Sequence, residues 1–211
     1  MAEGSDSVTA VRNAAPALRK RGAALEQAIL QAAWAEVSEV GYTAFSVEGV
    51  AGRARTGKAS IYRRWPTKQE LVMDALLERL PTAEQCGFVP LLDESVTTAE
   101  ALYGVARTIA GVITSPAGDV MRAIKCEALA DPELAQLIDD RFQAPRRAAM
   151  LALLERGVRR GEVRPGAATP LVADVIPAVL THRVILQREP VKERDIAAIM
   201  EQVFIPLIEI R

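Results

Sequence analysis

The sequence predicts an all-α protein made of a small N-terminal three-helix domain and a larger C-terminal helical domain. Apolar residues recur at helical spacing along most of the chain, and no stretch alternates polar and apolar residues for long enough to form a convincing strand. Half of the 211 residues are hydrophobic by type, which suffices to bury a core and excludes a wholly disordered chain.

The N-terminal segment, residues 1–18, is rich in Ala, Ser and Gly and has little periodicity, so we expect a flexible arm. An apolar stripe then runs from Arg19 to Val40, and Gly41 is placed to end this helix as a C′ residue. We therefore begin the small domain at residue 19.

Two short helices follow. Ser46 is a plausible N-cap for a helix over 47–54, whose apolar residues recur at i, i+3, i+4 and i+7. A turn over 55–57 leads into about two turns of helix over 58–65, which Pro66 ends. The small domain is accordingly assigned to residues 19–66.

The larger domain is assigned to residues 67–211. A capping box, Thr67 to Glu70, opens a connecting helix over 67–80, and residues 81–93 are typical of a loop. Pro145 and Pro177 lie inside later helical segments, which we expect them to kink or split. The long apolar-patterned segments are 97–114, 117–130, 132–161, 170–188 and 191–208.

Composition argues against several classes of protein. The longest stretch free of Asp, Glu, Lys and Arg has 11 residues, Thr108 to Gly118, whereas a membrane-spanning helix needs roughly 18 or more. The first ten residues lack the basic and apolar regions of a secretory signal. Two cysteines 40 residues apart and a single histidine make a zinc site or a disulfide framework implausible. We expect a cytoplasmic protein without metal or cofactor.

The formal net charge of −1 hides an asymmetry. Residues 19–68 contain nine basic and four acidic side chains, whereas residues 81–211 contain 15 basic and 18 acidic ones. Such a division suggests that the first part meets a polyanion. The alternative is that the cations merely coat a solvated helix face.

Two short helices joined by a turn with glycine are the signature of a helix-turn-helix, whose second helix lies in the major groove of DNA. Ile61 and Trp65, four residues apart, are expected to face inward and anchor that helix. Gly57 allows the backbone to approach a phosphate. The candidate DNA-binding residues are Arg55, Gly57, Lys58, Ala59, Ser60, Tyr62, Arg63, Arg64 and Lys68.

These candidates have different expected roles. Lys58 and Ser60 could read bases, and Ala59 could touch a thymine methyl group. Tyr62 is better suited to a phosphate. Lys68 lies in the first turn of the next helix, where its charge is unfavourable unless a phosphate sits nearby.

The stretches 41–47, 50–51 and 57–68 resemble the N-terminal DNA-binding domain of TetR-family repressors. The resemblance covers roughly residues 19–70 and implies a homodimeric bacterial transcription regulator with a larger ligand-binding and dimerisation domain. Residues 58–64 match the recognition helix, Tyr62 the phosphate-contacting aromatic residue, and the basic residue after Pro66 also agrees with the family.

One position departs from the family pattern. Arg55 stands where these proteins usually have a glycine that takes a positive φ. Two interpretations stay open: the turn is strained or differently shaped, or Arg55 adds a phosphate contact. The basic residues near the N-terminus, Arg12 and 19–21, are likewise either solvated or in contact with DNA.

The C-terminal domain carries no strong motif. Its last two segments hold more apolar residues than one buried stripe requires, which favours a subunit interface over core packing alone. The candidate interface residues are Val172, Val175, Ile176, Val179, His182, Ile199, Val203 and Phe204.

An effector pocket is expected among the middle helices. Its candidate residues are Tyr103, Met121, Arg122, Lys125, Cys126, Phe142, Arg146 and Met150.

The favoured function is that of a ligand-responsive repressor, a homodimer that binds a palindromic operator and is released by a small molecule. An all-α enzyme is the first alternative, but no motif pairs a nucleophile with a base. A non-specific DNA-binding protein is the second, and it would bind random duplexes equally well. The effector, the operator, the regulated genes and the sign of regulation stay open.

Overall fold

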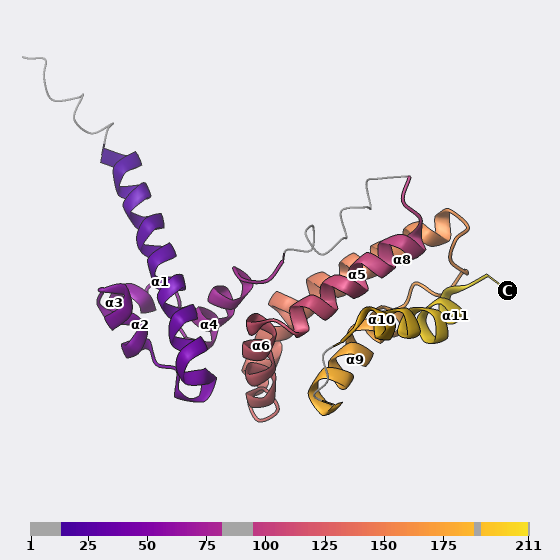
Figure 1. Cartoon of the computed structure of the whole chain (residues 1–211). Helices are drawn as coiled ribbons and strands as arrows, with labels where there is room; N and C mark the ends of the chain where they lie inside the picture. The colour runs from indigo at the N-terminus through magenta and orange to yellow at the C-terminus, as the bar shows by residue number, and fades with distance from the viewer. Residues whose placement is uncertain (1–13, 82–94, 188–190, 211) are drawn as a thin grey trace, which may run out of the picture. The chain divides into compact units, whose positions relative to one another are not determined.

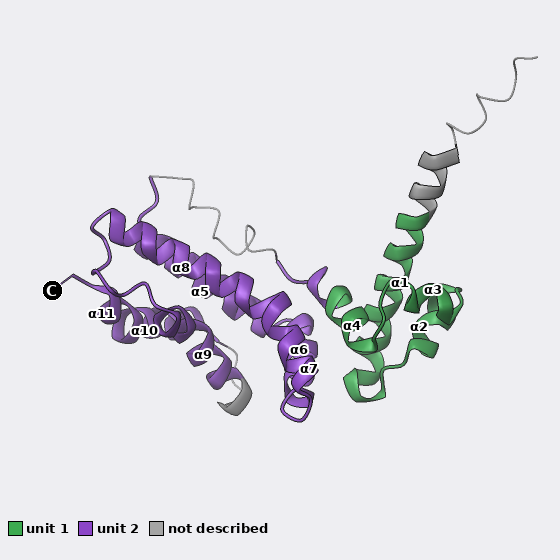
Figure 2. Ribbon diagram, turned by 180° about the vertical axis from the view of Figure 1, so that it is seen from behind, with its two compact units in different colours: residues 1–75 green, residues 76–211 purple. Residues whose placement is uncertain are grey.

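The computed structural model describes residues 14–81, 95–187 and 191–210 (Figure 1). Every regular element in these ranges is a helix, which confirms the all-α prediction. None of these helices combines the length and apolar character that a bilayer crossing requires. The chain divides into two compact units, residues 1–75 and 76–211 (Figure 2).

Unit 1 contains a long first helix and the two short helices that the sequence predicts. The first helix begins at Ala14, five residues earlier than expected, and the rest of the predicted arm, residues 1–13, lies outside the described residues. Gly41 interrupts it with φ 75°, which confirms the predicted break. The helices are α1 (Ala14–Ala44), α2 (Val47–Ala54), α3 (Lys58–Tyr62) and α4 (Lys68–Leu77).

The boundary between the two compact units lies within α4, between Ala75 and Leu76, in the helix that the sequence predicts to connect the two domains. Asp74 on α4 accepts a hydrogen bond of 2.8 Å from the indole Nε1 of Trp65. Lys68, at the start of α4, lies 5.2 Å from the centre of the Tyr42 ring. These contacts tie most of α4 to the small unit.

A buried carboxylate fixes α2 against α1. Glu36 on α1 is only 7% exposed and accepts a hydrogen bond of 2.6 Å from Nε of Arg53 on α2. The Nη2 atom of Arg53 also lies 2.6 Å from Glu39. The helices approach so closely that a Cβ atom on Gly49 would lie 1.9 Å from Glu36 Oε1. A side chain at position 49 would therefore displace the Glu36 carboxylate from its place beside Arg53.

Unit 2 is built from longer helices around one core. Helix α5 contacts α8, α9 and α10, and the core contains the fully buried side chains of Leu102, Leu153, Ile176 and Phe204. The predicted loop over 81–93 lies almost wholly outside the described residues. The helices are α5 (Thr98–Ile113), α6 (Pro116–Glu127), α7 (Pro132–Ile138), η3 (Asp139–Gln143), α8 (Ala144–Arg159), α9 (Pro170–Gln187), α10 (Glu193–Ile199), η4 (Met200–Phe204) and α11 (Ile205–Ile208).

Two prolines are accommodated by π-helical turns. The π-helices η3 and η4 each end two residues before a proline, Pro145 and Pro206 respectively. Proline lacks an N–H donor and clashes with the preceding turn, and a widened turn relieves both problems. Pro145 thus divides its segment as expected, whereas Pro177 stays inside the single helix α9.

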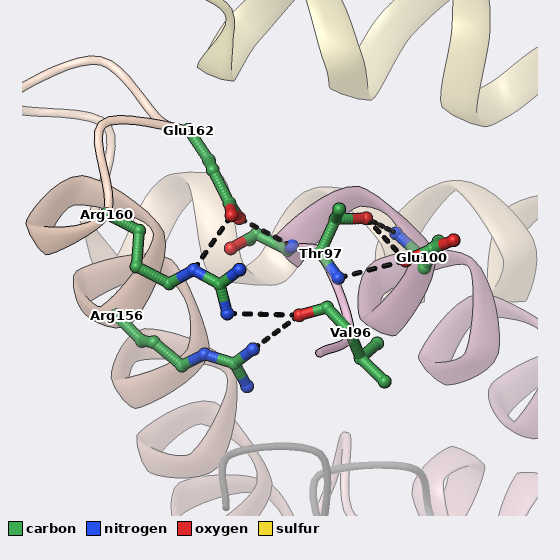
Figure 3. A network of polar contacts seen from close by, with 7 residues as sticks. Val96, Thr97, Glu100, Arg156, Arg160 and Glu162 are labelled. Carbon is green, nitrogen blue, oxygen red and sulfur yellow. Dashed lines mark hydrogen bonds and ion pairs between the residues drawn. The ribbon is translucent and has the colours of Figure 1, made fainter. Parts of the chain in front are cut away.

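A polar network holds the start of α5 against the end of α8 (Figure 3). The carbonyl oxygen of Val96 accepts hydrogen bonds from Arg156 (2.6 Å) and Arg160 (3.1 Å). Glu162 accepts the backbone N–H of Thr98 at 2.7 Å and forms an ion pair of 2.8 Å with Arg160. The network therefore joins positions at least 60 residues apart in the sequence.

The Glu162 carboxylate makes this network sensitive to acid. Burial by itself raises the pKa of Glu162, but hydrogen bonds from Thr98 and the charges of Arg160 and Arg156 outweigh it, so the pKa lies below its ordinary value of 4.5. The carboxylate therefore stabilises the fold above pH 4.5, and this contribution is lost as the pH falls below that value.

We expect Glu162→Gln to lower the free energy of unfolding at pH 7 and to flatten its decline below about pH 5. Urea unfolding of both proteins at a series of pH values measures this difference. Glu155→Gln, on the exposed face of α8, is the control and should keep the parent profile. Parallel pH profiles for Glu162→Gln and the parent would contradict the assignment.

Candidate nucleic-acid interface and internal cavity

Local interactions shape the two short helices and the turn between them. Ser46 caps α2 by accepting the N–H of Gly49 at 3.1 Å, as the sequence predicts. Helix α2 ends at Ala54 with Arg55 as its C-cap, and α3 begins after Gly57, which offers no side chain to cap it. The first N–H groups of α3 therefore emerge beside an exposed glycine.

Helix α3 is anchored by the two residues that the sequence singled out. Ile61 has no exposed surface, and Trp65 is 4% exposed. The indole N–H of Trp65 is satisfied by Asp74, so the ring is buried without an unpaired donor. The expected inward orientation of both side chains is confirmed, and the opposite side of α3 faces outward.

All nine candidate DNA-binding residues, which lie on α3, in the turns on either side of it and at the start of α4, are at least partly exposed. Tyr62 has 47% of its surface exposed although it adjoins the buried Ile61. Half-buried positions are Ser60, Arg64 and Lys68. Exposed positions are Arg55, Gly57, Lys58, Ala59, Tyr62 and Arg63.

Several of these side chains already have partners within the chain. Lys58 Nζ lies 2.5 Å from Glu48 Oε1, and this contact raises the pKa of Lys58 and lowers that of Glu48. Arg64 donates to the carbonyl oxygen of Ser60 at 2.9 Å. The contact of Arg63 with the Ser60 hydroxyl is long, at 3.5 Å. Arg63 is therefore freer to bind a phosphate than Lys58.

Sequence reasoning missed Glu48 as a partner of Lys58. The two residues lie ten positions apart on different helices, so helical periodicity could not pair them. Their contact depends on the angle between α2 and α3, which is a tertiary property.

Arg55 occupies the left-handed region of backbone conformation, with φ 51° and ψ 46°. This is the conformation in which the family usually has glycine, so the turn keeps the positive φ and carries the strain of a side chain there. Arg55 is the only residue other than glycine with a positive φ in the described part of the chain.

A cavity of about 140 Å³ lies inside unit 2. Its walls come from four helical regions: α5, α6, the η3–α8 junction and α9. In each region the lining residues recur at helical spacing, so they lie on one face of the helix. Six of the eight predicted pocket residues line it: Met121, Arg122, Lys125, Phe142, Arg146 and Met150. The lining residues that the sequence analysis missed are Ile109, Val112, Ile113, Gly118, Gln143, Arg147, Ala173, Asp174, Pro177 and Thr181.

Two of the predicted pocket residues do not line this cavity. Tyr103 does not line the cavity, and its hydroxyl lies 3.4 Å from Glu201 because it faces η4. Cys126 is exposed on α6, one position beyond the stripe that ends at Lys125. On α6 the lining positions 118, 121, 122 and 125 follow helical spacing, and Cys126 lies outside the face that they share. On α5 the positions 109, 112 and 113 follow the same spacing, so this pattern would have predicted them in place of Tyr103.

The eight candidate interface residues divide into two groups. Ile176, Ile199 and Phe204 belong to the core of unit 2 and are at most 4% exposed, so their prediction as interface residues is corrected: their side chains fill the subunit itself. The other five keep some exposed surface. Val203 is 41% exposed, His182 is also exposed, and Val172, Val175 and Val179 are partly buried.

The sequence matches two family models. The model described as "Bacterial regulatory proteins, tetR family" matches residues 29–75, which hold the anchored helix. The model described as "Tetracyclin repressor-like, C-terminal domain" matches residues 94–203, just over half of the chain.

Similar proteins come from several bacteria. The HTH-type transcriptional regulator YdeS of Bacillus subtilis is 30% identical over 190 residues, which cover 88% of this chain and 91% of YdeS. The DNA-binding transcriptional repressor TetR of Mycobacteroides abscessus is 31% identical, covering 89% and 96% of the two chains. The crystal structure of FadR from Bacillus subtilis in complex with stearoyl-CoA has a TM-score of 0.63 at 19% identity, with 86% and 97% covered.

The strained turn gives a direct test. We expect Arg55→Gly to raise the free energy of unfolding by about 0.5–1 kcal/mol, because a left-handed side chain costs about 1–2 kcal/mol and the freedom of glycine offsets about 0.5–1 kcal/mol. Arg63→Gly, where φ is −67°, is the matched control and should lower stability. Urea unfolding measures the stability of both variants, and a less stable Arg55→Gly protein would refute the strain.

The DNA affinity of the Arg55→Gly protein separates the two interpretations of Arg55. Weaker binding than the parent is expected only if Arg55 contacts a phosphate.

Proposed function

This chain belongs to the TetR family of bacterial regulatory proteins, and we propose that it is a homodimeric repressor that a small molecule releases from a palindromic operator. Proteins of this family regulate transcription and are not enzymes. The observation that carries the proposal is the anchored helix α3, which buries Ile61 and Trp65 and turns its donor-rich side outward.

The donors on α3 suit a division between bases and phosphates. Lys58, Ala59 and Ser60 are at the start of α3, the part of a recognition helix that meets base edges. Tyr62 and Arg63 follow on the exposed side, where phosphates of the flanking backbone are the expected partners. Lys68 would contact a further phosphate with its ammonium group, which lies 5.2 Å from the centre of the Tyr42 ring.

Repression rather than activation is proposed because a relative of similar length, from Mycobacteroides abscessus, is named a repressor. A two-fold symmetric dimer would present two copies of α3 to half-sites about one helical turn apart, roughly 34 Å. A regulator of transcription works where the chromosome lies, so we propose the cytoplasm as its location.

The proposed dimer uses α9 together with the C-terminal helices. Leu171, at the start of α9, is 79% exposed, and Val203 and Leu207 are 41% and 36% exposed. His182 and the partly buried valines of α9 extend this apolar surface. Large exposed aliphatic side chains on neighbouring helices are typical of a surface that a second subunit covers.

The proposed effector site is the cavity of unit 2. Its walls come from four helical regions, so an occupant would contact elements that are far apart in the sequence and could change their packing. The FadR structure with stearoyl-CoA is a precedent for a small-molecule ligand in a protein of similar fold.

Selection of duplexes from a random pool, followed by fluorescence anisotropy on the selected sequence, tests the proposal. A repressor of this kind should enrich a palindrome and bind it at least about 10³-fold (about 4 kcal/mol) more tightly than a shuffled duplex. Equal affinity for both duplexes would favour a non-specific DNA-binding protein instead.

Charge changes on α3 and its neighbours should change operator affinity in opposite directions. We expect Arg63→Ala and Lys68→Ala to weaken operator binding and to reduce the salt slope by about one for each phosphate that is no longer neutralised. Glu48→Gln releases Lys58 from its ion pair and should strengthen binding several-fold. Anisotropy titrations over a range of salt concentrations measure all three. Unchanged slopes for both alanine variants would disprove the assigned surface.

Charge on the exposed apolar surface should break the dimer. We expect Leu171→Lys combined with Val203→Lys to yield monomers and to weaken operator binding by about 10²-fold or more, because two linked half-site contacts become independent. Light scattering coupled to gel filtration gives the mass. Leu129→Lys, at a position 90% exposed on the turn after α6, is the control and should stay dimeric. A dimeric double variant would place the interface elsewhere.

A further inference from the structure

The cavity in unit 2 has an uneven charge. Among the described residues, four cationic side chains line it, Arg122, Lys125, Arg146 and Arg147, against the single carboxylate of Asp174. Burying several cations around one space is unfavourable unless each has a partner of opposite charge.

Two of these cations are neutralised by carboxylates. Arg147 lies 3.1 Å from Asp174 and 3.7 Å from Asp139. Arg122 forms an ion pair with Asp119, one turn earlier on α6. The positive charge in excess is therefore centred on Lys125, in another part of the lining.

Lys125 lacks such a partner. In the ranges that the structure describes, no carboxylate forms an ion pair with its ammonium group, which lies 5.7 Å from the centre of the Phe142 ring. The Arg146 guanidinium lies 4.0 Å from the centre of the same ring. It donates to the backbone carbonyl oxygens of Phe142 and Pro81, each at 3.1 Å, and these bonds hold it against the ring that Lys125 also approaches.

The positive charge of Arg146 acts on Lys125. Burial, and then this charge, hold the pKa of Lys125 below its ordinary value. An anion bound between the two groups would relieve both effects, because it would replace lost hydration and separate like charges.

The rest of the lining is mostly apolar, and the space is small. Ile109, Val112, Ile113, Met121 and Met150 offer only aliphatic and thioether surface. A volume of about 140 Å³ is close to that of a cavity, roughly 150 Å³, known to take up a single benzene ring. The space suits a small apolar body and excludes a second large polar group.

We propose that the effector is a small amphiphilic carboxylate, with its anionic group between Lys125 and Arg146 and its apolar body against Met121 and Met150. This inference rests on the proposed function, since it names the class of ligand for the same cavity. Lys125 selects the charge of the ligand, and the apolar stripe of α5 limits its size.

Three probes with the same phenylpropyl skeleton and nearly equal size separate charge from shape: 3-phenylpropionate, 3-phenylpropan-1-ol and 3-phenylpropylamine. In calorimetric titrations of the full-length protein, the carboxylate should bind at least tenfold more tightly than the alcohol, and the amine should not bind. Equal binding of carboxylate and alcohol, or no binding of any probe, would overturn the inference.

Variants of Lys125 locate the effect. Lys125→Met should lower the affinity for the carboxylate about tenfold, to that of the alcohol, without changing the affinity for the alcohol. Lys125→Arg keeps the positive charge and should keep the preference for the carboxylate over the alcohol. This result would show that the loss in Lys125→Met comes from the missing charge and not from misfolding. Arg159→Met, on the exposed last turn of α8, is the matched control and should leave all three affinities unchanged.

Release of the selected operator duplex by the same probes separates this inference from the proposed function. Carboxylate-selective binding with release supports both. Carboxylate-selective binding without release supports the ligand class and overturns the proposed release mechanism. Release by the alcohol as readily as by the carboxylate overturns the ligand class and leaves a ligand-responsive repressor intact.

Discussion

The burial of Ile61 and Trp65 is the constraint on which the DNA-facing surface depends. Helix α3 has five residues and is far too short to be stable in isolation. Its position therefore comes from the core of unit 1, where Ile61 is fully buried and the indole of Trp65 is tied to Asp74. Because one side of so short a helix is committed to the core, Tyr62 and Arg63 are left on the other side. The exposed cations follow from the apolar contacts beneath them.

Arginine has two distinct roles in this chain, and composition cannot tell them apart. Arg53 joins α2 to α1 through Glu36 and Glu39, and Arg156 joins α8 to the start of α5. Arg63, by contrast, makes only a long side-chain contact among the described residues, with the hydroxyl of its neighbour Ser60. Charge asymmetry along the sequence predicts a basic surface, but tertiary contacts decide which cations are available to form it.

In unit 2, one helix serves three surfaces. Along α9, Ile176 fills the core, Pro177 and Thr181 line the cavity, and Leu171 is exposed. This explains why the apolar content of the segment exceeds what a single buried stripe requires. It also explains why Ile176 was misassigned to a subunit interface: an apolar residue on such a helix can face any of three directions, and neighbouring helices select one.

The sequence by itself determined the helical class, the breaks and the anchors. The cap at Ser46, the break at Gly41 and the inward pair at 61 and 65 depend on residues within one or two turns, so local chemistry specifies them. Only the tertiary structure decided the partner of Lys58, the exclusion of Tyr103 from the cavity and the convergence of Lys125 with Arg146. These outcomes require helices distant in sequence to meet at particular angles, and packing sets those angles.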